Sequence, residues 1–269
     1  LAQSQSPPVA AGRQVQTAPV VPAPPAVDLA ALSLSAAQAE ALAQALRGAG
    51  AHGLPSEMFA PDAALAQMAE PDPAARANVW PSLPLEAWQD TYATLHLWTQ
   101  IVGKIRLVQT PWFNHSWHVT FEVTPRGLRT PPIPHGTRTF QMEFDFSNHQ
   151  LVIQTSDGDQ RSIALRPCAV ADFYGEIMAT LRELRLPVHI STKPNEIEAP
   201  IPFEQDHVHA AYDPDYANRL WRILLQADRV LKTFRARFGG KSSPVHFFWG
   251  SFDLAVTRFS GRPAPPHPG

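Results

Sequence analysis

The aromatic residues of this chain lie almost entirely after residue 77. Residues 1–77 contain no Trp or Tyr and a single Phe, with three basic and six acidic residues. A segment with so little large apolar surface offers little to offset the entropy that folding costs. The hydrophobic core of this chain must therefore be built by residues 78–269.

The opening segment divides into two parts. Residues 1–32 include QSPPVAAG and APVVPAPPAV, a Pro/Ala-rich composition that favours extended polyproline conformations, so we expect a disordered linker. Residues 33–77 carry two short helical patterns, SLSAAQAEALAQALRGAG with a cap at Ser35, and PDAALAQMAE. Neither pattern buries much by itself, so we expect a disordered or loosely helical N-terminal arm that is dispensable for folding.

The segment LSAAQAEALAQALRGAGAHGLPSEMF resembles the helical scaffold near the start of bacterial periplasmic L,D-transpeptidases, with its Ala-rich helix and His-Gly-Leu turn. The catalytic Cys/His motif of those enzymes is absent, since Cys168 lacks matching surroundings. The resemblance therefore implies no activity, and both a fusion and an adaptor would explain it.

Charge and motifs exclude several functional classes. The 22 basic and 24 acidic residues give a net charge of −2, which does not favour nucleic acid or an anionic membrane as partner. No Gly-rich phosphate loop, dinucleotide fingerprint, Gly-x-Ser-x-Gly elbow or His-Glu-x-x-His motif occurs. No run approaches the ~20 apolar residues that span a bilayer. We expect no cofactor, no nucleic acid and no membrane partner, and no pattern specifies an oligomeric state.

The single cysteine and the N-terminus bear on the compartment. Cys168 rules out an internal disulfide and a Cys-based zinc site, and is compatible with a reducing compartment. We expect a buried, non-catalytic thiol. Because no signal-peptide pattern follows Leu1, we expect a cytoplasmic protein. An exported protein is the alternative, since the chain does not begin with Met and a signal could have been removed.

Residues 78–269 alternate between helical and strand patterns. Apolar residues at helical spacing from Leu85 to Val102 predict a helix, with Pro84 at its start and Gly103 near its exit. Strict alternation predicts strands in HSWHVTFEV, TFQMEFDF, LVIQT and RSIAL, with an Asp157-Gly158 hairpin turn before the last. A second helix over VADFYGEIMATLREL, a strand over LPVHIST, a loop and a helix from about Tyr216 to Phe238 follow. This order predicts an α+β domain, an antiparallel meander covered by helices.

Long motifs in this region resemble one bacterial family. They are LPLEAWQDTYATLHLWTQIVGK, RTFQMEFDF, ADFYGEIMATLRELRLPVHI and SPVHFFWGSFDLAVTRFSGRPAP. In order and spacing they are similar to domain-of-unknown-function family 5996, from Trp80 to about Pro266. The resemblance implies no established activity, cofactor or catalytic residue. Because members continue past the Arg-Pro-Ala-Pro stretch, we expect the domain to be truncated at the C-terminus.

The stretch KSSPVHFFWGSFDLAVTRFSGR carries an acid and two arginines among aromatics. As a strand it would have one core face, with Phe248, and one face that mixes aromatic and polar side chains, as a small-molecule pocket does. We expect His118 to approach Asp253 from a neighbouring strand. A structural interpretation, with Asp253 pairing with an arginine or capping a turn, stays open, as does a helix. The ligand-binding candidates are His118, His246, Trp249, Ser251, Asp253, Thr257, Arg258 and Arg262.

Pairs of histidines and a run of basic residues raise the question of metal and anion binding. His115 and His118 would face opposite sides of a strand, and His207 with His209 is a pairing common by chance, so we expect no metal site. From Arg219 to Lys241 seven basic residues stand against one acid. A solvated helix face explains them, and an anion-binding flank is the sharper hypothesis. Its candidates are Arg219, Arg222 and Arg229.

Three functional hypotheses follow for the domain. The first is a small-molecule-binding domain with a pocket between the meander and its helices. The alternatives are an enzyme of unassigned class that uses His118, Asp253 and an arginine, and an interaction module tethered by the N-terminal arm. A binder requires an apolar pocket with few titratable groups, and an enzyme requires convergent ionisable groups.

Overall fold

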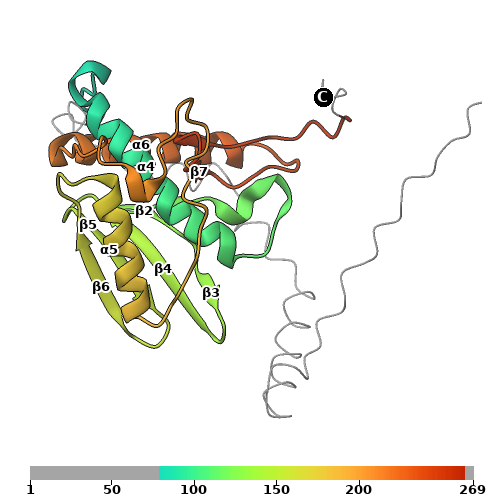
Figure 1. Ribbon diagram of the computed structural model, residues 1–269. Helices are drawn as coiled ribbons and strands as arrows, with labels where there is room; N and C mark the ends of the chain where they lie inside the picture. Colours follow the sequence, from blue (N-terminus) through green and yellow to red (C-terminus); the bar gives the residue numbers. More distant parts are fainter. Residues whose placement is uncertain (1–78, 264–269) are drawn as a thin grey trace, which may run out of the picture. The chain divides into compact units, whose positions relative to one another are not determined.

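The computed structural model describes residues 79–263 (Figure 1). The chain divides into the units Leu1–Ala60 and Pro61–Gly269, and every described residue belongs to the second. The linker expected at 1–32, the helical segment expected at 33–77 and its transpeptidase-like stretch lie outside the described residues.

The described residues contain one antiparallel sheet of six strands with the order β1-β2-β4-β5-β6. β2 pairs with residues 143–145 of β4 and β3 with residues 138–140, so these two short strands lie end to end along one edge of β4. The predicted α+β class and antiparallel meander are therefore confirmed. The strands are β1 (Glu122–Val123), β2 (Gly127–Arg129), β3 (Ile133–His135), β4 (Arg138–Asp145), β5 (Gln150–Thr155) and β6 (Gln160–Ala164).

The two central strands follow the alternation of the sequence. Phe140, Met142 and Phe144 of β4 are buried, and the last two pair with Ile153 and Leu151 of β5, whose side chains are buried as well. Residues two apart on a strand share a face, so these side chains form one apolar layer. The turn into β6 uses the predicted glycine, since Gly158 has a φ of 92°.

Three α-helices pack with this sheet: α4 (Leu85–Gln109), α5 (Val170–Glu183) and α6 (Pro214–Ala236). Figure 1 shows α5 lying over β5 and β6, and α5 contacts β6. The buried apolar stripe of this helix comprises Val170, Phe173, Ile177 and Leu181, and Leu184 just after the helix is buried as well. In α4 the Trp98 ring is fully buried and stacks on Phe173, with 4.2 Å between ring centroids. α4 is thus a central helix of the core, enclosed along most of its length.

A small second sheet joins the C-terminal region to the first. β7 (His246–Phe248) and β8 (Asp253–Ala255) form an antiparallel hairpin. Phe121, just before β1, exchanges two backbone hydrogen bonds of 2.9 Å with Phe247. The hairpin is therefore fixed at the start of the main sheet.

Three local predictions are wrong. HSWHVTFEV forms the 3-10 segment η3 (Asn114–Val119) and the two-residue β1, because His115 and Ser116 adopt left-handed φ values of 60° and 56°. LPVHIST runs without strand pairing. The first helix continues past Gly103 to Gln109. A second 3-10 turn, η4 (Phe203–Gln205), lies in the predicted loop.

We expect Phe144→Ala to lower the free energy of unfolding by about 3 to 5 kcal/mol, because a large, fully buried aromatic side chain leaves a cavity when truncated. Urea denaturation measures the change. Gln154→Ala, on an exposed position of β5, is the matched control and should cost less than about 0.5 kcal/mol. A loss below about 1 kcal/mol for Phe144→Ala would contradict the assignment of this residue to the core.

Candidate functional site

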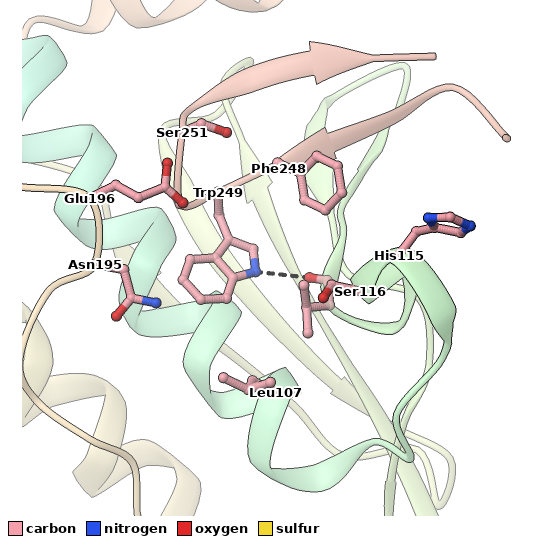
Figure 2. Close-up of a pocket in the computed structure, with 10 residues that line it drawn as sticks. Leu107, His115, Ser116, Asn195, Glu196, Phe248, Trp249 and Ser251 are labelled. Atoms are coloured by element: carbon pink, nitrogen blue, oxygen red, sulfur yellow. Dashed lines mark hydrogen bonds between the residues drawn. The ribbon is translucent and has the colours of Figure 1, made fainter. Parts of the chain in front are cut away.

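A cavity of about 440 Å³ lies where α4, η3, the loop after α5 and the β7–β8 turn meet (Figure 2). Its lining comes from four stretches of the chain: Leu107 of α4, three residues of η3, Asn195 with Glu196, and residues 248–251. The volume falls within the usual range for small-molecule sites. We call it the Trp249 cavity, because the indole of Trp249 stands at the centre of the lining residues in Figure 2.

Trp249 is held rigidly in place. Its side chain is 4% exposed, and its indole N–H donates a 2.9 Å hydrogen bond to the carbonyl oxygen of Val119. The ring packs on the backbone of α4 at Gly103, where an added Cβ would overlap the indole carbons. Gly103 therefore does not end the helix, as its position suggested. It is the notch that admits the ring.

Backbone strain gathers around this cavity. Six non-glycine residues between 79 and 263 have positive φ, and three of them line the cavity: His115, Ser116 and Glu196, at 60°, 56° and 56°. A left-handed backbone costs an L-residue roughly 1 to 2 kcal/mol. Such conformations persist only where surrounding structure enforces them, and they cluster at functional sites.

A row of polar side chains on α4 supports the cavity wall. His96, Gln100 and Lys104 follow one another at four-residue spacing and are all buried. The Gln100 amide accepts from Asn195 N–H at 2.8 Å and donates to Asn195 C=O at 2.9 Å. The Lys104 ammonium donates to Asn195 Oδ1 at 2.9 Å. His96 Nε2 lies 2.7 Å from the Gly250 carbonyl oxygen and 3.0 Å from the amide nitrogen of Gln100.

Burial controls the electrostatics of this row. It lowers the pKa of Lys104, whose ammonium makes no ion pair with any residue in 79–263. It also lowers the pKa of His96, although the Gly250 carbonyl and the charge of Glu196 oppose this effect. The Glu196 carboxylate itself is exposed toward the cavity. No described residue gives it a hydrogen bond or an ion pair.

The aromatic stretch forms a hairpin, and this corrects the single strand that the two-face prediction assumed. Phe252, at a φ of 58°, lies in the turn that reverses the chain, and its ring packs against Tyr92 and Phe247 with centroid distances of 5.2 Å. Trp249 and Ser251, two of the ligand-binding candidates, line the cavity. Phe248, predicted in the core, lines it too. Asp253 does not: it is exposed and accepts a hydrogen bond from the Ser251 hydroxyl.

The other ligand-binding candidates lie away from the cavity. His118 is buried and its Nδ1 accepts from Phe113 N–H at 3.2 Å, while buried His246 donates from Nδ1 to the Pro244 carbonyl at 2.7 Å. No hydrogen bond or ion pair joins His118 to Asp253, which it was expected to approach, whereas the charge of Asp253 acts on His246. Thr257 donates its backbone N–H to Ser243 Oγ. The guanidinium of Arg258 stacks 3.5 Å from the centroid of the Phe234 ring. Arg262 is exposed.

Two of the three anion-binding candidates lie together. Arg219 and Arg222 line a second cleft of about 450 Å³, with Asp215, Asn218 and residues 80–82. The Arg219 guanidinium donates to the Ser82 carbonyl at 3.3 Å and stacks on Tyr216. Arg229 is exposed and does not line the cleft.

The sequence interpretation passed over the residues that shape the Trp249 cavity. Asn195 and Glu196 belong to a loop without a motif, and His115 and Ser116 were assigned to a strand. One signal could have found the site: LHLWTQIVGK places His96, Gln100 and Lys104 four residues apart on an otherwise apolar helix. Polar side chains in such a row are buried only when they have partners.

Metal and membrane features are limited in the part of the chain described. His209 Nδ1 lies 2.7 Å from Asp206 Oδ2. No group of three or more His, Cys, Asp or Glu side chains within residues 79–263 is arranged to hold a metal ion. Within the same residues, the length and apolar character of the helices fall short of what crossing a membrane needs.

Fold and site together define an α+β domain whose C-terminal hairpin closes a cavity against its central helix. The family of unknown function DUF5996 matches residues 80–269, more than half of the chain, and the protein belongs to this family. The predicted family membership is thereby confirmed. Comparison with curated proteins and with solved structures gave no match.

We expect Gly103→Ala to destabilise the domain by about 1 to 3 kcal/mol, because the added methyl group overlaps the Trp249 ring. Gly175→Ala is the matched control, since Gly175 lies in α5 with nothing within 4 Å of an added Cβ. It should gain roughly 0.5 to 1 kcal/mol. Urea denaturation compares them, and equal stabilisation of both variants would show that the ring does not occupy the notch.

The buried histidines predict a loss of stability in mild acid. Burial lowers the pKa values of His96, His118 and His246. The unfolded chain therefore binds protons below about pH 6.5 that the folded chain rejects, and the free energy of unfolding falls as the pH drops from about 7 to about 5. Urea midpoints across this window measure the slope. His118→Gln should reduce the slope of the free energy of unfolding against pH. A slope of zero for the wild type would contradict the prediction.

Proposed function

We propose that this domain binds a small molecule in the Trp249 cavity. The observation that carries the proposal is the gathering of three left-handed residues, His115, Ser116 and Glu196, in the lining of one cavity. They come from two separate segments, so no single local turn motif accounts for them. Strain maintained in this way is typical of sites where side chains must be presented to a ligand.

The composition of the cavity supports binding rather than catalysis. Phe248, Trp249 and Leu107 supply apolar walls, while Ser116 and Ser251 add hydroxyl groups. Ligand sites commonly combine an apolar lining with a few fixed polar groups in this way. The enzymatic alternative needed His118, Asp253 and an arginine to converge, and these residues lie apart.

The polar row of α4 supports the same proposal. Its three side chains hold the backbone and side chain of Asn195 and the carbonyl of Gly250, which are wall groups, and leave the cavity itself open. A wall fixed before the ligand arrives lowers the entropic cost of binding. Gln100 and Lys104 therefore act as positioning residues for the cavity.

Indole, phenol and benzamide titrated into the ¹⁵N-labelled protein test the proposal. We expect at least one of them to shift the indole N–H resonance of Trp249, which Trp249→Phe assigns, with millimolar affinity typical of such small probes. Ser251→Trp should block the response by filling the rim of the cavity. Ser162→Trp, on an exposed position of β6, is the matched control and should retain it. Responses that survive Ser251→Trp, or no response at all, would refute binding in this cavity.

A further inference from the structure

We infer that the ligand of the Trp249 cavity carries a protonated amine beside an apolar body, an inference that rests on the proposed function. The argument begins with Glu196, the one carboxylate among the described residues that line the cavity. Its Oε1 lies 2.8 Å from the point where a Cβ on Gly250 would stand, so the carboxylate rests against the backbone of the β7–β8 turn. Figure 2 shows it directed toward Trp249.

Within residues 79–263 no Lys or Arg pairs with this carboxylate, and the titratable rings near it are those of His115, which also lines the cavity, and His96, on which its charge acts. Neither Lys nor Arg occurs among the described lining residues. Lys104 is buried and does not line the cavity, and its ammonium donates to Oδ1 of Asn195, which does. His96 Nε2 lies against the Gly250 carbonyl and the Gln100 amide rather than against Glu196. The charge of Glu196 is therefore presented to whatever enters the cavity.

The backbone presents this carboxylate at a cost. Glu196 has a φ of 56°, a conformation in which side chains other than those of Gly, Asn and Asp are uncommon. The hydrogen bonds of Gln100 hold the preceding residue, Asn195, by both its backbone groups. The loop is thus clamped at the residue that sets the direction of Glu196.

Aromatic side chains complete a cation site. Phe248 and Trp249 line the same cavity, and Figure 2 shows Trp249 next to Glu196 with Phe248 on the far side of Trp249. Aromatic faces attract cations through their quadrupole, and the same rings bury the apolar part of a ligand. A carboxylate with an aromatic wall matches an alkyl- or arylammonium compound and opposes a carboxylate or phosphate ligand.

Three probes of the same body and different head groups test this inference: 2-phenylethylamine, 2-phenylethanol and 3-phenylpropanoate. Their affinities for the full chain are measured by titration calorimetry. The NMR shift of the Trp249 indole N–H resonance shows whether each probe binds in the cavity. We expect the amine to bind about tenfold more tightly than the alcohol, since a charge-assisted hydrogen bond is worth more than a neutral one even at a partly exposed site. The acid should bind most weakly.

Glu196→Gln keeps the size of the side chain and removes its charge. It should reduce the affinity for the amine to that for the alcohol and leave the alcohol unchanged. Glu198→Gln is the matched control, because Glu198 is exposed two residues away and does not line the cavity. It should keep the full preference. Circular dichroism and urea denaturation confirm that both variants fold.

The outcomes separate this inference from the proposed function. Equal affinity for all three probes, with the Trp249 resonance shifting, overturns the amine inference and leaves small-molecule binding standing. Tighter binding of the acid than of the amine would also overturn the amine inference. So would an amine preference that persists in Glu196→Gln. If no probe shifts the Trp249 resonance, both fail.

Discussion

The packing of Trp249 on Gly103 is the contact on which the site depends. It fixes a residue near the C-terminal end of the described chain to the C-terminal half of α4, and the indole hydrogen bond to Val119 ties the same ring to η3. Three segments distant in sequence are thereby held at one point. Without the ring, the hairpin would keep its backbone bonds to Phe121, but the floor of the cavity would be missing. A glycine inside a helix costs about 1 kcal/mol of stability relative to alanine. At position 103 a glycine is needed in spite of this cost, because the indole ring approaches the helix backbone closely.

α4 contributes to both the core and the cavity wall, because its sequence places apolar residues on one face and a row of polar residues on another. Trp98 and Ile101 face the core with α5, whereas the row His96, Gln100 and Lys104 faces the loop and the β7–β8 turn. Burying this row requires a partner for each polar group, and those partners are mainly backbone groups of the cavity wall. The helix therefore determines the path of a loop that has no regular secondary structure of its own.

The sequence predicted the parts of the fold whose signals are local. The alternation through Phe140, Met142 and Phe144, the Asp157-Gly158 turn and the stripe of α5 each specify their element without help from elsewhere. Of the ligand-binding candidates, Trp249 and Ser251 line the cavity. The η3 segment and the turn at Phe252 were not predictable in this way, since their left-handed residues are not glycine or asparagine. Their conformations depend on tertiary contacts such as that of Phe252 with Tyr92.

The left-handed conformation of Glu196 and the burial of Gln100 and Lys104 depend on each other. A left-handed Glu196 is unfavourable in an isolated loop, yet the paired hydrogen bonds from Gln100 to Asn195 and the Lys104 bond to the same residue offset that cost. Lys104 in turn is costly to bury without a counter-ion, and its bond to Asn195 only partly compensates. Both costs fall at the wall of one cavity. The other left-handed non-glycine residues between 79 and 263 lie elsewhere, at His149 after β4, at Arg185 after α5 and at Phe252 in the β7–β8 turn. What distinguishes the cavity wall is that left-handed residues and a buried charge occur there together, which is the kind of conflict expected where the proposed ligand would be recognised.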